Sequence, residues 1–137
     1  MDADEIDFAD TRQCACSAAR RRSRELTRFY EQAMRGSGLR GTQFTLLATV
    51  IQTGPIPATR LADFLGLDRT TLTRNLGPLV RDGHVTITDG ADRRVHKVAI
   101  TATGAEAARA AFPFWRKAQD AVLARAAGSY KILGQYV

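Results

Sequence analysis

Residues 61–76 read LADFLGLDRTTLTRNL and contain two helical patterns separated by a tight turn. The spacing of the apolar residues predicts a short helix over residues 58–65, which Gly66 ends because glycine tolerates the left-handed backbone of a helix exit. Asp68 follows two residues later and is a favourable N-cap for a second helix over residues 69–82. Two helices joined by such a turn predict a helix-turn-helix.

The helix expected over residues 69–82 has one apolar and one polar face. Its inward positions are Leu72, Leu76, Leu79 and Val80. The opposite side carries the candidates for contact with the DNA major groove, namely Arg69, Thr70, Thr71, Thr73 and Arg74. Hydroxyl groups bond phosphates or bases, and an arginine can donate two hydrogen bonds to guanine. On an isolated helix the same side chains would form an ordinary solvated face, so the neighbouring segments decide between the two interpretations.

Beyond Gly83 the spacing of apolar residues changes from helical to alternating. Residues 85–88 and 95–100 therefore predict the two strands of a hairpin. Asp89 and Gly90 offer the chemistry of the turn between these strands. A hairpin that directly follows a helix-turn-helix indicates the wing of a winged helix-turn-helix.

The tip of this hairpin contains Asp92, Arg93 and Arg94. Arginines on such a tip can enter the minor groove of A·T-rich DNA, whose narrow segments attract them. Asp92 would be misplaced beside phosphates, so we interpret it as an ion-pair partner that holds one of the two arginines in an extended rotamer. The tip and the polar helix face together favour double-stranded DNA as the partner.

Helical patterns also flank this region on both sides. A long first helix is expected over residues 11–34, and Thr101 is expected to cap a last helix that starts at residue 102. Between the first helix and the helix-turn-helix, Thr42 is expected to cap a helix whose buried positions are Phe44, Leu47, Ala48 and Ile51. Prolines inside the expected fourth and last helices are interpreted as kinks. The expected fold class is mainly α with a small β-hairpin wing.

The composition favours one basic domain and a polyanionic partner. The chain has 137 residues, of which 45% are hydrophobic, enough for a single core. Its net charge of +6 arises outside residues 1–10, which are acidic and are expected to form a flexible tail. No apolar run reaches the roughly 18 residues of a membrane span, and the acidic start differs from a secretory signal. We therefore expect a cytoplasmic protein without a membrane partner.

The sequence lacks the residue patterns of a catalytic site. It has no glycine-rich phosphate loop, no nucleophile elbow and no cluster of acidic residues and histidines at metal-ligand spacing. His84, His96, Cys14 and Cys16 are scattered over expected helix, turn and strand, which is not the ligand spacing of a zinc site. We expect no enzymatic activity, no cofactor and no bound metal.

The stretch from Leu39 to Trp115 resembles the MarR family of bacterial transcription regulators. The matching segments lie at residues 38–47, 61–76, 79–83, 92–94 and 101–104. The wing Asp-x-Arg before an Ile-Thr-x-x-Gly helix start is the most specific of them. The resemblance implies one domain over residues 11–137, in which residues 42–100 form the winged DNA-binding region. It also implies that residues 11–34 and 102–137 form dimerisation helices, although the last residues, 128–137, are too few for the usual final helix of the family.

The function implied by this resemblance is that of a homodimeric, sequence-specific DNA-binding regulator. Members of the family are mostly repressors of palindromic operators, released by small aromatic ligands or by oxidation. The alternative is a winged-helix protein-interaction module that does not bind DNA. The feature that discriminates between the two functions is positive charge, because such a module would not require four arginines at these positions: Arg69, Arg74, Arg93 and Arg94.

Several residues outside the helix-turn-helix stay open to two interpretations. Cys14 and Cys16 are candidates for redox sensing or are thiols without function; two positions apart on a helix they cannot easily bridge each other, whereas a bridge across a dimer stays open. The basic run at residues 20–24 is a solvated face, an additional phosphate contact or the salt-bridged edge of a dimer. Five aromatic residues belong either to the core or to an effector pocket: Phe29, Tyr30, Phe112, Phe114 and Trp115.

Overall fold

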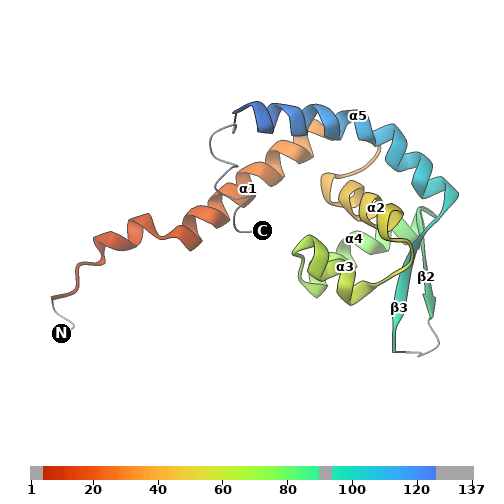
Figure 1. The fold of residues 1–137 in the computed structure, drawn as a ribbon, viewed down its shortest axis with the longest axis horizontal. Helices are drawn as coiled ribbons and strands as arrows, with labels where there is room; N and C mark the ends of the chain where they lie inside the picture. Colours follow the sequence, from red (N-terminus) through yellow and green to blue (C-terminus); the bar gives the residue numbers. More distant parts are fainter. Residues whose placement is uncertain (1–4, 90–93, 126–137) are drawn as a thin grey trace.

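The structure, a computed structural model, describes residues 5–89 and 94–125. In that part of the chain, helices pack on one side of a three-stranded antiparallel sheet (Figure 1). The order of elements confirms the expected fold class, a mainly α winged helix-turn-helix with flanking helices. The elements are η2 (Phe8–Gln13), α1 (Ala15–Ala33), α2 (Gly41–Thr53), β1 (Ile56–Pro57), α3 (Ala58–Leu65), α4 (Arg69–Arg81), β2 (Val85–Asp89), β3 (His96–Ile100) and α5 (Ala102–Arg125).

The core lies where α2, α3 and α4 pack against the sheet and the first half of α5. Its largest fully buried side chains are Met34, Leu46, Leu47, Val50, Leu61, Leu79 and Val98. Two residues expected to face inward do not, since Ile51 is 44% exposed and Val80 is 40% exposed. In α2 the buried face is wider than the expected stripe because α3, α4, α5 and β3 all contact this helix. Leu46 and Val50 are therefore buried as well.

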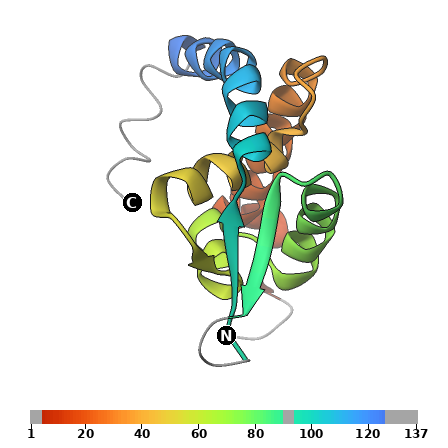
Figure 2. The same cartoon turned by 90° about the vertical axis from the view of Figure 1, so that its right-hand side faces the viewer.

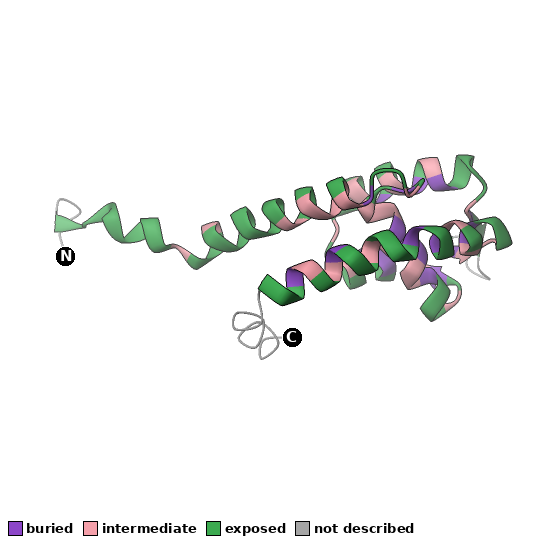
Figure 3. Cartoon of the chain, turned by 90° about the horizontal axis from the view of Figure 1, so that it is seen from above, coloured by how far each residue is buried: buried purple, intermediate pink, exposed green. Residues whose placement is uncertain are grey.

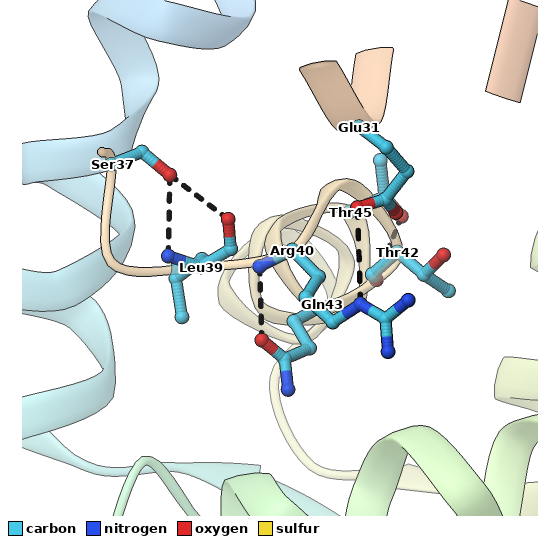
Figure 4. A network of polar contacts seen from close by, with 7 residues as sticks. All are labelled: Glu31, Ser37, Leu39, Arg40, Thr42, Gln43 and Thr45. Atoms are coloured by element: carbon cyan, nitrogen blue, oxygen red, sulfur yellow. Dashed lines mark hydrogen bonds and ion pairs between the residues drawn. The ribbon is translucent and has the colours of Figure 1, made fainter. Parts of the chain in front are cut away.

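The start of α2 also differs from the expectation. The helix begins at Gly41 with Arg40 as its N-cap residue, so Thr42 is not the cap. The backbone N–H of Arg40 donates to the Gln43 side-chain oxygen at 3.0 Å, while Arg40 Nε lies 3.8 Å from a Glu31 carboxylate oxygen of α1 (Figure 4). The Gln43 side chain thus satisfies the backbone N–H of the N-cap residue, as the third helical residue does in a capping box.

The sheet has the strand order β1-β3-β2 and contains one strand that the sequence does not predict. This strand, β1, pairs antiparallel with β3 through Ile56 opposite Val98 and Pro57 opposite Lys97. A strand of two residues, one of them a proline, is too short to show an alternating pattern, and proline is accepted only at a strand's edge or start. The second strand of the hairpin, expected over residues 95–100, begins one residue later, because β3 starts at His96.

The wing is connected to α5 through a close backbone contact. The Thr101 hydroxyl lies 2.6 Å from the Gly83 carbonyl oxygen and 3.0 Å from that of His84, and it accepts the Gly104 N–H at 3.0 Å. This last bond confirms Thr101 as the cap of α5. A Cβ atom on Gly104 would lie 2.0 Å from the His84 carbonyl oxygen, so only glycine fits there. We call Gly83, His84, Thr101 and Gly104 the α4–α5 joint.

The N-terminal region is less compact than the expected helix over residues 11–34. The backbone forms a short 3-10 helix, η2, whose N-cap Asp7 accepts the Ala9 N–H at 2.9 Å, and α1 starts only at Ala15. None of the residues of α1, all of which the structure describes, is buried (Figure 3). Figures 1 and 3 show η2 and the start of α1 extending beyond the rest of the chain.

The two prolines inside helices do not end them. Pro78 lies within α4 and Pro113 within α5, and both helices continue past these residues. None of the helices in residues 5–89 and 94–125 is long and apolar enough to cross a membrane.

Candidate nucleic-acid interface

Helix α4 is held in place by its apolar face and by its cap. Leu72, Leu76 and Leu79 are buried, which confirms three of the four inward positions expected for this helix. Asp68 caps the first turn, since its Oδ1 accepts the Thr71 N–H at 2.7 Å. The backbone hydrogen bond from Thr71, followed by the Thr71 hydroxyl, holds the pKa of Asp68 below its usual value. The Asp68 carboxylate therefore stays charged at the positive end of the helix dipole.

The polar face of α4 remains open to solvent in the monomer. Four of the five candidate residues for the major groove are exposed: Arg69, Thr70, Thr73 and Arg74. The fifth, Thr71, is half-buried, and its carbonyl oxygen accepts a hydrogen bond from Asn75 Nδ2 at 2.8 Å. The burial of one face and exposure of the other leave two arginines and two hydroxyls together on a rigid helix.

The strands of the hairpin run from the start of α5 to the opposite end of the molecule (Figure 2). Strands β2 and β3 pair in register from Val85 opposite Ile100 to Asp89 opposite His96. At the last pair, His96 Nδ1 lies 2.9 Å from Asp89 Oδ1. Of the predicted tip residues, Arg94 is exposed, while Asp92 and Arg93 lie outside the described residues.

The α4–α5 joint is a structural feature that the sequence analysis did not identify. Thr101 was recognised only as a cap, and Gly104 only as part of a family-like segment. Their common partner is a main-chain oxygen, that of His84, which no side-chain pattern reveals. The signal available in the sequence was a glycine inside the first turn of a helix, where glycine is otherwise unfavourable.

The two cysteines lie far along the chain from α4, where η2 meets α1. Cys14 is half-buried, Cys16 is exposed, and both are free thiols. Cys14 occupies the N-cap position of α1. A backbone hydrogen bond from Ser17, followed by one from the Ser17 hydroxyl, lowers the pKa of the Cys14 thiol, and Arg21 contributes a smaller Coulombic effect. Thiolate formation is therefore easier at this cysteine than for a thiol in water.

The five aromatic residues are divided between separate places. Phe112 and Trp115 of α5 pack against Phe44 of α2, with ring centroids 6.5 and 5.9 Å from the Phe44 ring. Tyr30 of α1 donates a hydrogen bond to the Gln119 side-chain oxygen of α5. Phe29 and Phe114 line a groove between α1 and α5. The structure therefore does not bring these aromatic residues together in one pocket.

Metal-ligating side chains are not clustered in the described part of the chain. Among residues 5–89 and 94–125 no group of three or more His, Cys, Asp or Glu residues could hold a metal ion.

Comparison with known proteins identifies the family. The model of the MarR family matches residues 37–95. The transcriptional regulator MosR of Mycobacterium tuberculosis, solved in complex with DNA, is 40% identical, with a TM-score of 0.73, and the match covers 90% of this chain and 95% of MosR. No curated protein sequence gives a significant match.

More distant solved structures share the fold. Reduced AbfR bound to DNA is 25% identical, with a TM-score of 0.66 over 88% of this chain and 86% of AbfR, and AbfR is also known in an overoxidized, DNA-bound form. Escherichia coli MarR is 18% identical, with a TM-score of 0.70 over 90% of this chain and 96% of MarR. The similarity to MosR spans nearly the whole chain and includes both flanking helices and the winged region. This chain therefore belongs to the MarR family of transcriptional regulators.

Proposed function

We propose that the protein binds double-stranded DNA sequence-specifically, with α4 in the major groove and the tip of the hairpin in the adjacent minor groove. The observation that carries this proposal is the exposed face of α4, which presents Arg69, Thr70, Thr73 and Arg74 while the leucines opposite are buried. The DNA complex of MosR, a relative at 40% identity, supports the same conclusion. In this proposal Arg74 reads a guanine, whereas Arg93 and Arg94 bind within the minor groove.

We further propose that the protein acts as a homodimer that represses transcription from a palindromic operator. A twofold pair of α4 helices would match two half-sites in successive major grooves, about 34–36 Å apart. The dimerisation helices proposed are residues 11–34 and 102–137, of which residues 126–137 lie outside the described part. The partial cover of α1 supports this role, because none of its 19 residues is fully buried and an amphipathic helix needs a surface to pack against.

The test compares two arginine variants on a selected operator. Arg74→Ala should weaken specific binding by about 1–3 kcal/mol and relax the preference at one or two base positions. Arg109→Ala, at an exposed arginine of α5, is the matched control and should leave the preference unchanged. The readout is the bound-sequence profile from selection with a random DNA library. An unchanged profile for Arg74→Ala would contradict the assignment of this residue.

A salt titration tests the phosphate contacts separately. Each neutralised phosphate contributes a slope of about −0.9 to the log-log dependence of the binding constant on salt concentration. The wild-type protein should show a steep slope, and Arg94→Ala should reduce the affinity for all sequences alike. A flat response to salt would favour the alternative of a protein-interaction module.

For release from DNA we propose oxidation at Cys14. The lowered pKa of this thiol favours the thiolate, which attacks peroxide so that one oxygen is transferred to sulfur as a sulfenic acid and the other leaves as hydroxide. Cys14→Ser should keep DNA binding in the presence of peroxide, while Cys16→Ser is the neighbouring control. Equal release of Cys14→Ser and the wild type would exclude this role. Release by a small aromatic ligand stays a prediction, because the aromatic residues expected to line its pocket are divided between separate places.

A further inference from the structure

A contact between an acidic side chain and a histidine closes the outer end of the hairpin. Asp89 and His96 are the last paired residues of β2 and β3, at the end of the ladder that lies away from α5 (Figure 2). His96 Nδ1 lies 2.9 Å from Asp89 Oδ1, and the side chains of His96 and Asp89 are 59% and 69% exposed. An exposed pair of this kind adds little to the stability of a protein. Its place beside the wing tip, where DNA binding is proposed, is therefore more informative than its strength.

The contact with Asp89 determines which nitrogen of the His96 ring carries the proton. An ionised carboxylate only accepts hydrogen bonds, so Nδ1 is the donor and Nε2 of the neutral ring has no proton. Within residues 5–89 and 94–125 the ring makes no other hydrogen bond. A phosphate oxygen would be repelled by the lone pair of the neutral Nε2. With a second proton on the ring, Nε2 becomes a donor that can bind a phosphate.

The charge of the pair also favours a second proton beside DNA. Asp89 is the only acidic residue among the described residues of the hairpin, 85–89 and 94–100. Next to a neutral histidine, its carboxylate would add a negative charge close to the phosphates. Protonation of His96 cancels this charge, and the potential of the DNA itself attracts protons to a basic site.

The other charged groups near the histidine ring are basic or make no contact with it. Arg94 and Lys97 lie close to it along the chain, and DNA phosphates would neutralise these two cations. Of the other elements packed against β3, neither β1 nor α2 has a charged residue. The charged residues of α3, Arg60 and Asp63, are exposed and make no ion pair with the ring. The pair can thus respond to DNA without competition from a second carboxylate in the described part of the chain.

We propose that His96 takes up a proton when the wing binds DNA, with Asp89 holding Nδ1 and the protonated Nε2 donating to a backbone phosphate. The proton comes from the solvent and stays on the ring while the complex lasts. His96 contacts the DNA, and Asp89 is a positioning residue that acts through it. Because the bound state holds more protons than the free state, binding strengthens as the pH falls. The inference rests on the DNA binding proposed above and adds a dependence on pH.

The binding constant for a selected operator, measured at constant salt from about pH 6 to about pH 8, tests the proposal. The wild-type constant should be higher at the lower pH by on the order of tenfold for a dimer with two wings. His96→Gln stays polar but does not titrate, so its affinity should be nearly constant over this range. His84→Gln is the matched control, because it removes the other histidine, whose Nδ1 is buried, and should keep the wild-type pH dependence. Circular dichroism checks the folding of both variants.

Asp89→Asn separates positioning from a merely structural role. The asparagine can still accept a hydrogen bond from Nδ1 but carries no charge. Its affinity at about pH 8 should therefore exceed that of the wild type, and its pH dependence should be weaker. If the pair only stabilised the hairpin, Asp89→Asn and His96→Gln would both lose affinity by a constant factor at every pH. That result would overturn the proposal.

Titration calorimetry measures the proton uptake directly. The binding enthalpy near neutral pH, compared between buffers of different ionisation enthalpy, should show a net uptake of protons by the wild type and a smaller uptake by His96→Gln. Equal uptake by the two proteins, or none by the wild type, would refute the role of His96. Failure of the proposed function would look different, because the protein would then bind no operator at any pH.

Discussion

Helices α4 and α1 look alike in sequence and differ completely in how the structure supports them. Both alternate apolar residues with arginines at helical spacing. In α4 the apolar side contributes three buried leucines to the core, whereas no residue of α1 is buried. Their N-cap residues also differ, because a carboxylate, Asp68, caps α4, whereas a thiol, Cys14, stands at the N-cap position of α1.

This difference shows that an amphipathic pattern predicts a buried apolar face but does not predict which molecule covers that face. For α4 the surface comes from the same chain, so its outer face is free to bind another molecule. For α1 the described part of the chain supplies only partial cover from α5 and α2. We therefore expect the two helices to respond differently to mutation. Of the four experiments below, two compare the helices directly, and two test how α4 is capped and how the winged region is attached to α5.

The largest expected effect is the loss of a leucine from the core face of α4. Leu79→Ala should lower the free energy of unfolding by about 2–5 kcal/mol, because Leu79 is 1% exposed and its removal leaves a cavity. The matched change in α1, Leu26→Ala, should cost less than about 1 kcal/mol, since Leu26 is only half-buried. Urea unfolding of both variants gives the two values. Equal costs would contradict the contrast between the helices.

The second experiment addresses the α4–α5 joint, through which the winged region is attached to α5. Gly104→Ala should destabilise the protein by about 1–3 kcal/mol, because the new methyl group would overlap the His84 carbonyl oxygen. Thr103→Ala, at an exposed position in the same helical turn, is the control and should be nearly neutral. Thermal unfolding measures both. An unchanged unfolding temperature for Gly104→Ala would contradict this prediction, because the backbone at His84 would then accommodate the methyl group without loss of stability.

The third experiment concerns the hydrogen bond that connects α1 to α5. Tyr30→Phe removes the hydroxyl that donates to Gln119 and should cost about 0.5–1.5 kcal/mol. Hydrogen exchange is the informative measurement, because protection should fall in the amides of α1 and stay unchanged in α4. A uniform loss of protection over the whole chain would indicate that α1 and the core unfold as one unit.

The smallest effect is expected from the pH dependence of the α4 cap. Because the folded protein lowers the pKa of Asp68, its stabilisation is present above the ordinary value of 3.8 and is lost as the pH falls through the lower, folded value. Asp68→Asn retains a capping oxygen but does not titrate. The stability of the wild type relative to this variant should therefore decrease on acidification below pH 3.8. A constant difference between the two proteins at all acidic pH values would exclude this linkage.

The sequence predicted the local features of the fold well. Helix α3 has the expected bounds, and α4 ends within one residue of the expectation, because Gly66 and Asp68 act on their immediate neighbours. The exposure of Arg69 and Arg74 agrees with their helical positions. These signals depend only on the chain within a few residues, which is why they can be interpreted without knowing the fold.

Features that depend on contacts between distant residues were missed. Strand β1 exists only because Ile56 meets Val98, and Ile51 is exposed because several elements shape the buried face of α2. The expected helix from residue 11 begins later because Asp7 caps a separate 3-10 helix. The assignment of Arg69, Thr70, Thr71, Thr73 and Arg74 to the major groove, and of Arg94 to the minor groove, stays a prediction.

The main-chain contact between Gly104 and His84 has a mechanical consequence for a dimer. Because the first turn of α5 rests directly on the backbone that connects α4 to the wing, the wing and the start of α5 move together. The 24 residues of α5 span at most about 36 Å. A tilt of about 5° over the length of α5 would shift α4 by about 3 Å, close to the rise of one base pair at about 3.4 Å. In the proposed dimer, a change of this size at the far end of α5 would displace one α4 helix by about one base pair relative to the other.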